Sequence, residues 1–235
     1  MSLNSMDSDV FLSMSSSDDS FHSTSFLPLD KTLDSCFSDC LKNLNVIHIN
    51  AQSIPAHYPD MLASFDSRNI HAILVSESWL KTCLPSTSYS LPGFRLIRND
   101  RVGKGGGGVA IYLRSYIPFT VISMSSQPPL PDAAEHLLVE VLISHYPKIL
   151  LGVFYCPPYV SDYFRSFESL LEKEVPLYSH SIIFGDFNTC LLKNDYRSKK
   201  FLTTVESCNL SVLPLAATHY SPGCTPSLLD LIMVS

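Results

Sequence analysis

A short apolar run that ends in Gly-Asp-Phe-Asn constrains this sequence more than any other stretch. Residues 180–192 read HSIIFGDFNTCLL, and residues 181–184 have the β-branched and aromatic composition of a strand buried on both faces. Gly185 ends the run, and Asp186 and Asn188 follow two residues apart. An acid and an amide placed in this way can point into one cleft, where a carboxylate binds a hard cation or transfers a proton. A polar turn that closes a core strand would show the same residues.

Length and composition allow one large α/β domain or two smaller ones. The chain has 235 residues, of which 46% are hydrophobic, and its longest apolar runs are far too short to span a membrane. The N-terminus lacks the basic start and apolar run of a signal peptide. Seven cysteines are scattered without a Cys-x-x-Cys pair, which predicts reduced thiols of an intracellular protein rather than a disulfide framework or a zinc site.

The acidic charge is concentrated at the N-terminus. The net charge is −6, but residues 1–40 contain seven of the 22 acids and one of the 16 bases, so the rest of the chain is neutral. This distribution neither favours nor excludes DNA as a partner. Residues 1–43 are rich in Ser and Asp and predict a disordered leader, or alternatively a short docking or phosphorylation segment. Residues 44–235 form the predicted folded domain.

Alternating and apolar runs predict the regular elements of this domain. Strands are expected at 45–50, 71–76, 94–98, 109–117, 119–122, 137–143, 149–155, 210–213 and 227–234, and helices at 57–69, 161–174 and 199–208.

Polar side chains follow or interrupt several of these strands. Asn50 ends the first strand, Glu77 follows the second directly, and Tyr155 ends another before two prolines. A glutamate so close to a buried strand is costly unless a cation offsets its charge, although a solvated acid at a strand end would look the same. Asp230 interrupts the last apolar run and requires a partner, for which histidine is the usual choice in hydrolytic sites.

A glycine-rich stretch matches the dinucleotide-binding fingerprint only formally. The glycines of Gly103-x-Gly105-x-x-Gly108 precede residues 109–117, which alternate like a strand, whereas the fingerprint must open a helix. A hairpin loop between antiparallel strands is the better interpretation. Basic side chains border the loop and are candidates for phosphate or DNA contacts, unless they are simply solvated: Arg98, Arg101, Lys104 and Arg114.

The order of these motifs resembles one superfamily. Asn50, Glu77 in SESWL, GGGVAIYL, Tyr155 in FYCPP, GDFN, the turn at Thr218 and SLLDLI occur in this order in endonuclease/exonuclease/phosphatase enzymes, which include deoxyribonuclease I and the abasic-site endonucleases. The chain resembles in particular the endonuclease domain of non-LTR retrotransposon polyproteins, over residues 44–235. This resemblance implies a four-layer α/β sandwich of two mostly antiparallel or mixed β-sheets flanked by helices.

The resemblance also implies roles for individual residues. Glu77 would ligate Mg²⁺, or alternatively Mn²⁺, with Asn50 close to the metal. Asp186 and Asn188 would position the attacking water and the scissile phosphate, and Tyr155 would hydrogen-bond a phosphate oxygen. Thr218 would shape the site and contact the phosphate, and Asp230 would orient a catalytic histidine. His219 matches no functional position of the family and is interpreted as structural.

The implied activity is Mg²⁺-dependent nicking of one DNA strand. The product 3′-hydroxyl would prime reverse transcription, so the implied partners are double-stranded DNA and a downstream reverse transcriptase domain, in the nucleus. In the family the histidine lies in a Ser-Asp-His-like motif downstream of the Asp230 strand, and no histidine follows Asp230 here. The domain is therefore expected to lack its C-terminal strand. The alternatives are a decayed, inactive copy and another phosphodiesterase of the superfamily that acts on phosphoinositides or sphingomyelin.

Overall fold

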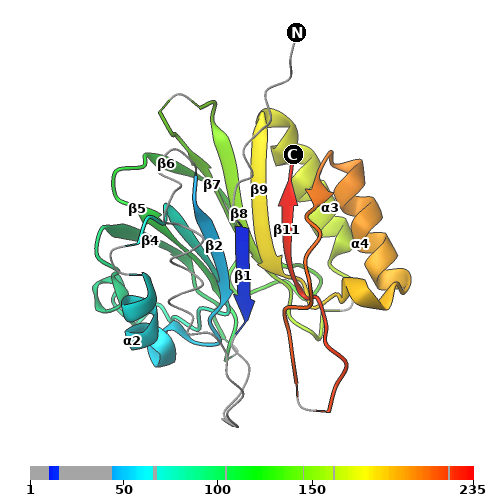
Figure 1. The fold of residues 1–235 in the computed structure, drawn as a ribbon, viewed down its shortest axis with the longest axis horizontal. Coiled ribbons are helices and arrows are strands. Elements are labelled where there is room, and N and C mark those ends of the chain that lie inside the picture. The colour runs from blue at the N-terminus through cyan, green and yellow to red at the C-terminus, as the bar shows by residue number, and fades with distance from the viewer. Residues whose placement is uncertain are drawn as a thin grey trace.

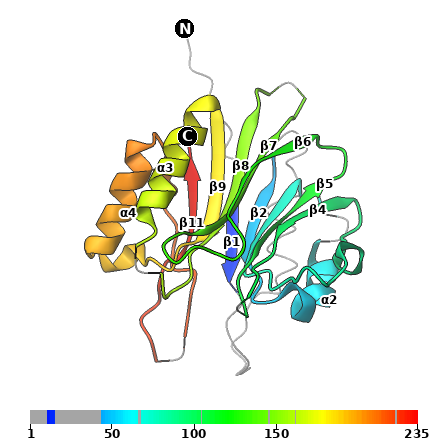
Figure 2. The same ribbon diagram turned by 180° about the vertical axis from the view of Figure 1, so that it is seen from behind.

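Two β-sheets pack face to face, and helices cover their outer faces (Figures 1 and 2). This arrangement is seen in a computed structural model, which describes residues 11–15, 44–65, 68–103, 105–144, 146–160, 162–221 and 223–235.

The first sheet has five strands in the order β1-β2-β3-β5-β4. Its strands are β1 (Phe11–Ser15), β2 (Val46–Asn50), β3 (Ala72–Ser76), β4 (Phe94–Asn99) and β5 (Val109–Arg114). Strand β2 runs parallel to β1 and β3, and β5 runs antiparallel to both β3 and β4. The β4–β5 pairing confirms that the glycine-rich stretch is the loop of a hairpin.

The second sheet has six strands in the order β10-β11-β9-β8-β7-β6. These are β6 (Phe119–Met124), β7 (Glu135–Val141), β8 (Ile149–Tyr155), β9 (His180–Asp186), β10 (Ser211–Val212) and β11 (Asp230–Val234). Strands β8 and β9 are parallel, and the other neighbours are antiparallel.

Three hydrophobic clusters separate four layers. One lies between the five-stranded sheet and α2 (Ile54–Phe65), a second lies between the two sheets, and a third lies between the six-stranded sheet and α3 (Phe164–Glu174) with α4 (Tyr196–Ser207). Short 3₁₀ helices span Ser86–Tyr89, Val175–Leu177 and Leu191–Lys193. The predicted four-layer sandwich is confirmed.

Two helices begin three residues before the predicted start because polar side chains cap them. Ser53 Oγ accepts a hydrogen bond from the backbone N–H of Ala56 at 3.2 Å, and α2 begins at Ile54. Asp195 accepts one from Ser198 N at 2.9 Å, and α4 begins at Tyr196. Such caps satisfy N–H groups that the first turn of a helix leaves unpaired. A prediction from apolar periodicity does not detect the capping residues.

The prediction of a disordered leader over residues 1–43 falls mostly outside the described residues and stays a prediction there. Phe11–Ser15 differs from it, because these residues form β1 alongside β2. Within the described segments, no helix combines the length and apolar character needed to cross a bilayer. Five cysteines lie in those segments, and each is a free thiol: Cys83, Cys156, Cys190, Cys208 and Cys224.

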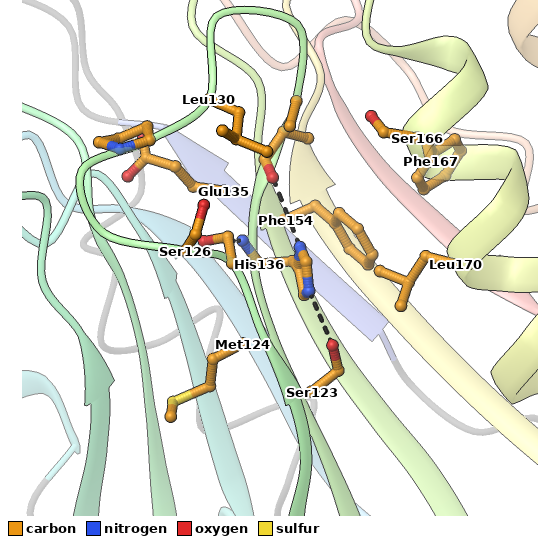
Figure 3. A pocket seen from close by; sticks show the side chains of 14 residues that line it. Ser123, Met124, Ser126, Leu130, Glu135, His136, Phe154, Ser166, Phe167 and Leu170 are labelled. Carbon is orange, nitrogen blue, oxygen red and sulfur yellow. Dashed lines mark hydrogen bonds between the residues drawn. The ribbon is translucent and has the colours of Figure 1, made fainter.

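A cavity of about 320 Å³ lies between β6, β7 and α3 (Figure 3). Within it, His136 Nε2 is 3.0 Å from Ser123 Oγ, and its ring stacks on Phe154 with the centroids 5.4 Å apart. Burial lowers the pKa of His136 to about 4 from its usual 6.5, and a weak bond to the Ala134 carbonyl opposes this shift. The imidazole is therefore neutral in the folded protein at neutral pH.

Protonation of His136 should destabilise the fold in mild acid. A base whose pKa is lowered by folding stabilises the protein fully above its unfolded pKa, here about 6.5, and that stability is lost as the pH falls toward about 4. We expect His136→Gln to reduce the loss of unfolding free energy between pH 7 and pH 4.5 by about 1–2 kcal/mol. Urea denaturation at both pH values measures it. Ser126→Ala, at a non-ionisable residue that lines the same cavity, is the control and should keep the wild-type loss.

Candidate active site

The strand order brings the predicted polar residues to one edge of the sandwich. Parallel strands β2 and β3 end together in the first sheet, and parallel strands β8 and β9 end together in the second. Strand β11 runs the other way and begins at this edge, so that Asp230 pairs in register with Asp186, which in turn pairs with Tyr155. The ends of five strands therefore supply the site.

One amide joins the two sheets at this edge. Asn50 Nδ2 donates to Glu77 Oε1 at 3.0 Å and to Asp186 Oδ2 at 2.9 Å. Asn50 and Glu77 belong to the five-stranded sheet and its loops, whereas Asp186 ends a strand of the other sheet. Asn50 Oδ1 accepts from the backbone N–H of Gln52 at 3.2 Å, which fixes the orientation of the amide.

The segment after β3 holds Glu77 in an unusual backbone conformation. Glu77 and Trp79 have φ angles of 52° and 51°, in the left-handed region that costs non-glycine residues about 1–3 kcal/mol unless their surroundings hold them. Trp79 N donates to the Gly107 carbonyl at 2.9 Å, and Trp79 Nε1 donates to Glu77 Oε2 at 3.2 Å. The glycine-rich loop thus helps to hold the glutamate.

The Gly-Asp-Phe-Asn stretch builds the opposite side of the site. Asp186 Oδ1 accepts from the backbone N–H of Asn188 at 3.0 Å, and Asn188 Nδ2 donates to the Cys156 carbonyl at 2.9 Å. Gly185 is required because a Cβ there would lie 2.5 Å from the Phe154 carbonyl oxygen on the neighbouring strand. The missing side chain lets β9 pack against β8 and carries Asp186 to the edge.

Asp230 is held by Thr218 and lies beside a buried histidine. Thr218 Oγ1 accepts from the backbone N–H of Asp230 at 3.1 Å. His48 Nδ1 is 3.8 Å from Asp230 Oδ1, and complete burial lowers the pKa of His48 to about 3, so this imidazole is neutral. His219 pairs through its backbone with Ser227 and forms a 2.9 Å contact with Ser221.

Three ionisable side chains of the site are buried and therefore poorly solvated. Burial, reinforced by the neighbouring Asp230 carboxylate, raises the pKa of Asp186 well above its usual value. Burial also raises the pKa of Asp230 to about 6. The pKa of Tyr155 is raised by burial and by the carboxylates of Glu77 and Asp186, so its hydroxyl remains a hydrogen-bond donor at neutral pH.

The carboxylate oxygens of this site fit a hard cation of the Mg²⁺ type. Among the described residues there is no group of three or more His, Cys, Asp or Glu side chains arranged as a metal cage. Mg²⁺ does not require one, because it binds through one or two carboxylates and keeps several waters. Glu77 and Asp186 flank one amide and crowd negative charge that a cation would offset.

The structure corrects the predictions for two of the basic candidates. Arg101 is buried, and its guanidinium forms an ion pair with Glu135. Arg98 forms an ion pair with Asp100 and donates to the Lys81 and Leu84 carbonyls. Both guanidinium groups are used inside the protein, so neither presents a free cation to a phosphate. Lys104 lies outside the described residues.

Sequence reasoning missed two residues at this edge. Trp79 is the single tryptophan of the chain and contacts Glu77, and its position two residues after that glutamate was the available signal. Glu135 is 1% exposed, although it is charged. An acid at the start of an apolar strand suggests a buried partner, but nothing local identifies that partner as Arg101.

Comparison with known proteins identifies the family. The model of the Endonuclease/Exonuclease/phosphatase family matches residues 46–235. The chain belongs to this family. A search of curated proteins found no match.

Solved structures of this family have the same fold. The endonuclease domain of TRAS1, a telomere-specific non-LTR retrotransposon, aligns with a TM-score of 0.60 at 16% identity, over 81% of this chain and 84% of that one. The 3′ phosphatase NExo from Neisseria, bound to a product DNA hairpin, gives 0.61 at 16% identity, over 82% and 87%. The Leishmania major AP endonuclease gives 0.63 at 13% identity, over 82% and 79%. At these identities the similarity establishes the fold.

The close approach of β8 and β9 at Gly185 should be essential for stability. We expect Gly185→Ala to lower the free energy of unfolding by about 1–3 kcal/mol, because the new Cβ would collide with backbone atoms that cannot move aside. Gly105→Ala is the matched control, since a Cβ there meets nothing within 4 Å. Urea titration of both variants measures the difference, and equal stabilities would contradict the packing argument.

Proposed function

We propose that this chain is a Mg²⁺-dependent DNA endonuclease that nicks one strand by hydrolysing a phosphodiester bond. The observation that carries the proposal is the amide of Asn50, which holds Glu77 and Asp186 together at the edge where Tyr155 and Asn188 also lie. An edge built from carboxylates and hydrogen-bond donors suits a phosphodiester, whose hydrolysis develops negative charge on the phosphorus oxygens and the leaving oxygen.

Each side chain has a task that follows from its chemistry. Asp186, with its raised pKa, orients the attacking water and accepts its proton. The hydroxyl of Tyr155 and the amide of Asn188 donate hydrogen bonds to the phosphate oxygens, and the high pKa of Tyr155 keeps its proton in place. Asp230 is held by Thr218 and lies 3.8 Å from the His48 ring, and its carboxylate is placed to orient a catalytic imidazole.

Glu77 and Asn50 are the residues that would hold the cation. When bound, Mg²⁺ or Mn²⁺ offsets the negative charge that develops on the phosphate. The hydrogen bond from Trp79 Nε1 to Glu77 Oε2 fixes the direction in which the carboxylate points.

The retrotransposon role is the finer part of the proposal. The order of motifs and the shared fold with the TRAS1 endonuclease domain support it. A nick that leaves a 3′-hydroxyl supplies a primer, so we propose that this chain works with a reverse transcriptase domain on chromosomal DNA in the nucleus.

Nicking of supercoiled plasmid tests the activity. We expect Mg²⁺-dependent conversion to the open circle, inhibited by EDTA, and a fall of about 10² or more in rate for Asp186→Asn because the water loses its proton acceptor. Glu206→Gln, on the exposed face of α4, is the control. Extension of the nick by a DNA polymerase checks for the 3′-hydroxyl. Cleavage confined to abasic duplexes or 3′-phosphate oligonucleotides would instead assign a repair activity.

Thermal unfolding with and without the metal tests the role of Glu77. A ligand that binds only the folded state raises the unfolding midpoint, so Mg²⁺ should stabilise the wild-type chain. We expect Glu77→Ala to abolish this increase, because a hard cation with few protein ligands depends on each carboxylate. Glu206→Ala should keep it. An undiminished Mg²⁺ response in Glu77→Ala would remove Glu77 from the metal site.

A further inference from the structure

A buried ion pair joins the two sheets beside the candidate active site. Arg101 follows β4 in the five-stranded half of the molecule, and Glu135 begins β7 in the six-stranded sheet. Their side chains are 4% and 1% exposed, and Arg101 Nε donates to Glu135 Oε1 at 2.6 Å. None of the roles proposed for the active-site residues involves this pair.

One end of the pair leads to Glu77. The second carboxylate oxygen of Glu135 accepts from the backbone N–H of Gly108 at 2.7 Å. The Gly108 carbonyl accepts from Ser78 N at 3.0 Å, next to Glu77 in the chain, and the adjacent Gly107 carbonyl accepts from Trp79 N at 2.9 Å. Glu135 therefore fixes the glycine loop that holds the strained segment around Glu77.

The other end leads to Tyr155. The Arg101 guanidinium lies over the Tyr155 ring, 5.4 Å from its centroid, and Glu135 pairs in register with Tyr155 across β7 and β8. The guanidinium also lies directly against the Gly107 backbone, where a Cβ would be 2.0 Å from Arg101 Cζ. The ion pair thus touches both the loop that holds Glu77 and the ring of Tyr155.

Stability alone does not explain such a pair. Removing two charges from water is costly, and apolar residues of similar size often replace a buried ion pair without loss of stability. Correct placement, however, is demanding: a displacement of about 1 Å can reduce a catalysed rate by about 10².

We propose that the Arg101–Glu135 pair is a positioning element that fixes Glu77 and Tyr155 relative to each other across the two sheets. Its role in the rate rests on the proposed phosphodiester hydrolysis. Its role in holding the loop does not, because the loop geometry exists without substrate.

The test is the neutral double variant Arg101→Met with Glu135→Gln. The glutamine keeps an acceptor for Gly108 N, while the charges and the guanidinium contact with Tyr155 are removed. We expect a folded protein with its unfolding midpoint within about 5 °C of wild type, a fall of about 10- to 100-fold in kcat for plasmid nicking, and KM within about threefold. The emission of Trp79, the single tryptophan, should shift because its loop moves.

A second ion pair, whose carboxylate also lies on β7, provides the control. Lys148 and Glu140 form an ion pair of 2.8 Å at the other end of β7, away from the glycine loop. Lys148→Met with Glu140→Gln should leave kcat and Trp79 emission unchanged. Wild-type kcat and emission in a folded Arg101/Glu135 variant would overturn the proposal.

A second variant displaces the guanidinium without removing any charge, and it decides the question if the double variant does not fold. In Gly107→Ala the new Cβ would overlap Arg101 Cζ, whereas in Gly103→Ala, at a glycine that also has a positive φ, the new Cβ meets nothing within 4 Å. We expect Gly107→Ala alone to lower kcat and shift the emission, and identical behaviour of the two variants would overturn the proposal. If the wild-type chain does not nick DNA, the proposed function fails, and Trp79 emission still tests the loop contact.

Discussion

The hydrogen bonds from the Asn50 amide to Glu77 and Asp186 are the contact on which the candidate active site depends. The two carboxylates come from different sheets and would repel each other, and one neutral donor satisfies both. The contact is possible because the interior cluster between the sheets sets their spacing, and because parallel strands β2, β3, β8 and β9 all end at this edge. Packing between the sheets therefore decides the geometry of the chemistry.

The price of this arrangement is charge held out of water. Burial raises the pKa values of Asp186 and Asp230, and repulsion by the Asp230 carboxylate adds to the shift at Asp186. The segment at Glu77 and Trp79 occupies a backbone region that costs free energy. Backbone bonds from the glycine loop oppose this strain, and the loop is itself held by the Arg101–Glu135 pair. Strain and unpaired charge concentrated at one edge are typical of a site arranged for binding and catalysis.

Much of this edge could be predicted because its signals are local. Asn50, Glu77, Tyr155, Asp186 and Asp230 each follow or interrupt an apolar strand, and the structure brings all five together. The strands other than β1 were predicted from periodicity, and the four layers were implied by the order of motifs. Helix starts were less accurate, since capping by Ser53 and Asp195 depends on single side chains.

The sequence by itself determined which strands are buried, where polar residues leave them, and the family to which the pattern belongs. Only the tertiary structure decided which charged side chains are paired inside the protein and which could contact a ligand. Arg101 and Glu135 are 34 residues apart, and Asn50 and Asp186 are 136 apart. Arginines beside a glycine loop look alike in the sequence whether they face phosphate or an internal carboxylate. The difference lies in a partner from another sheet, and partners at such separations leave no mark on local hydrophobic periodicity.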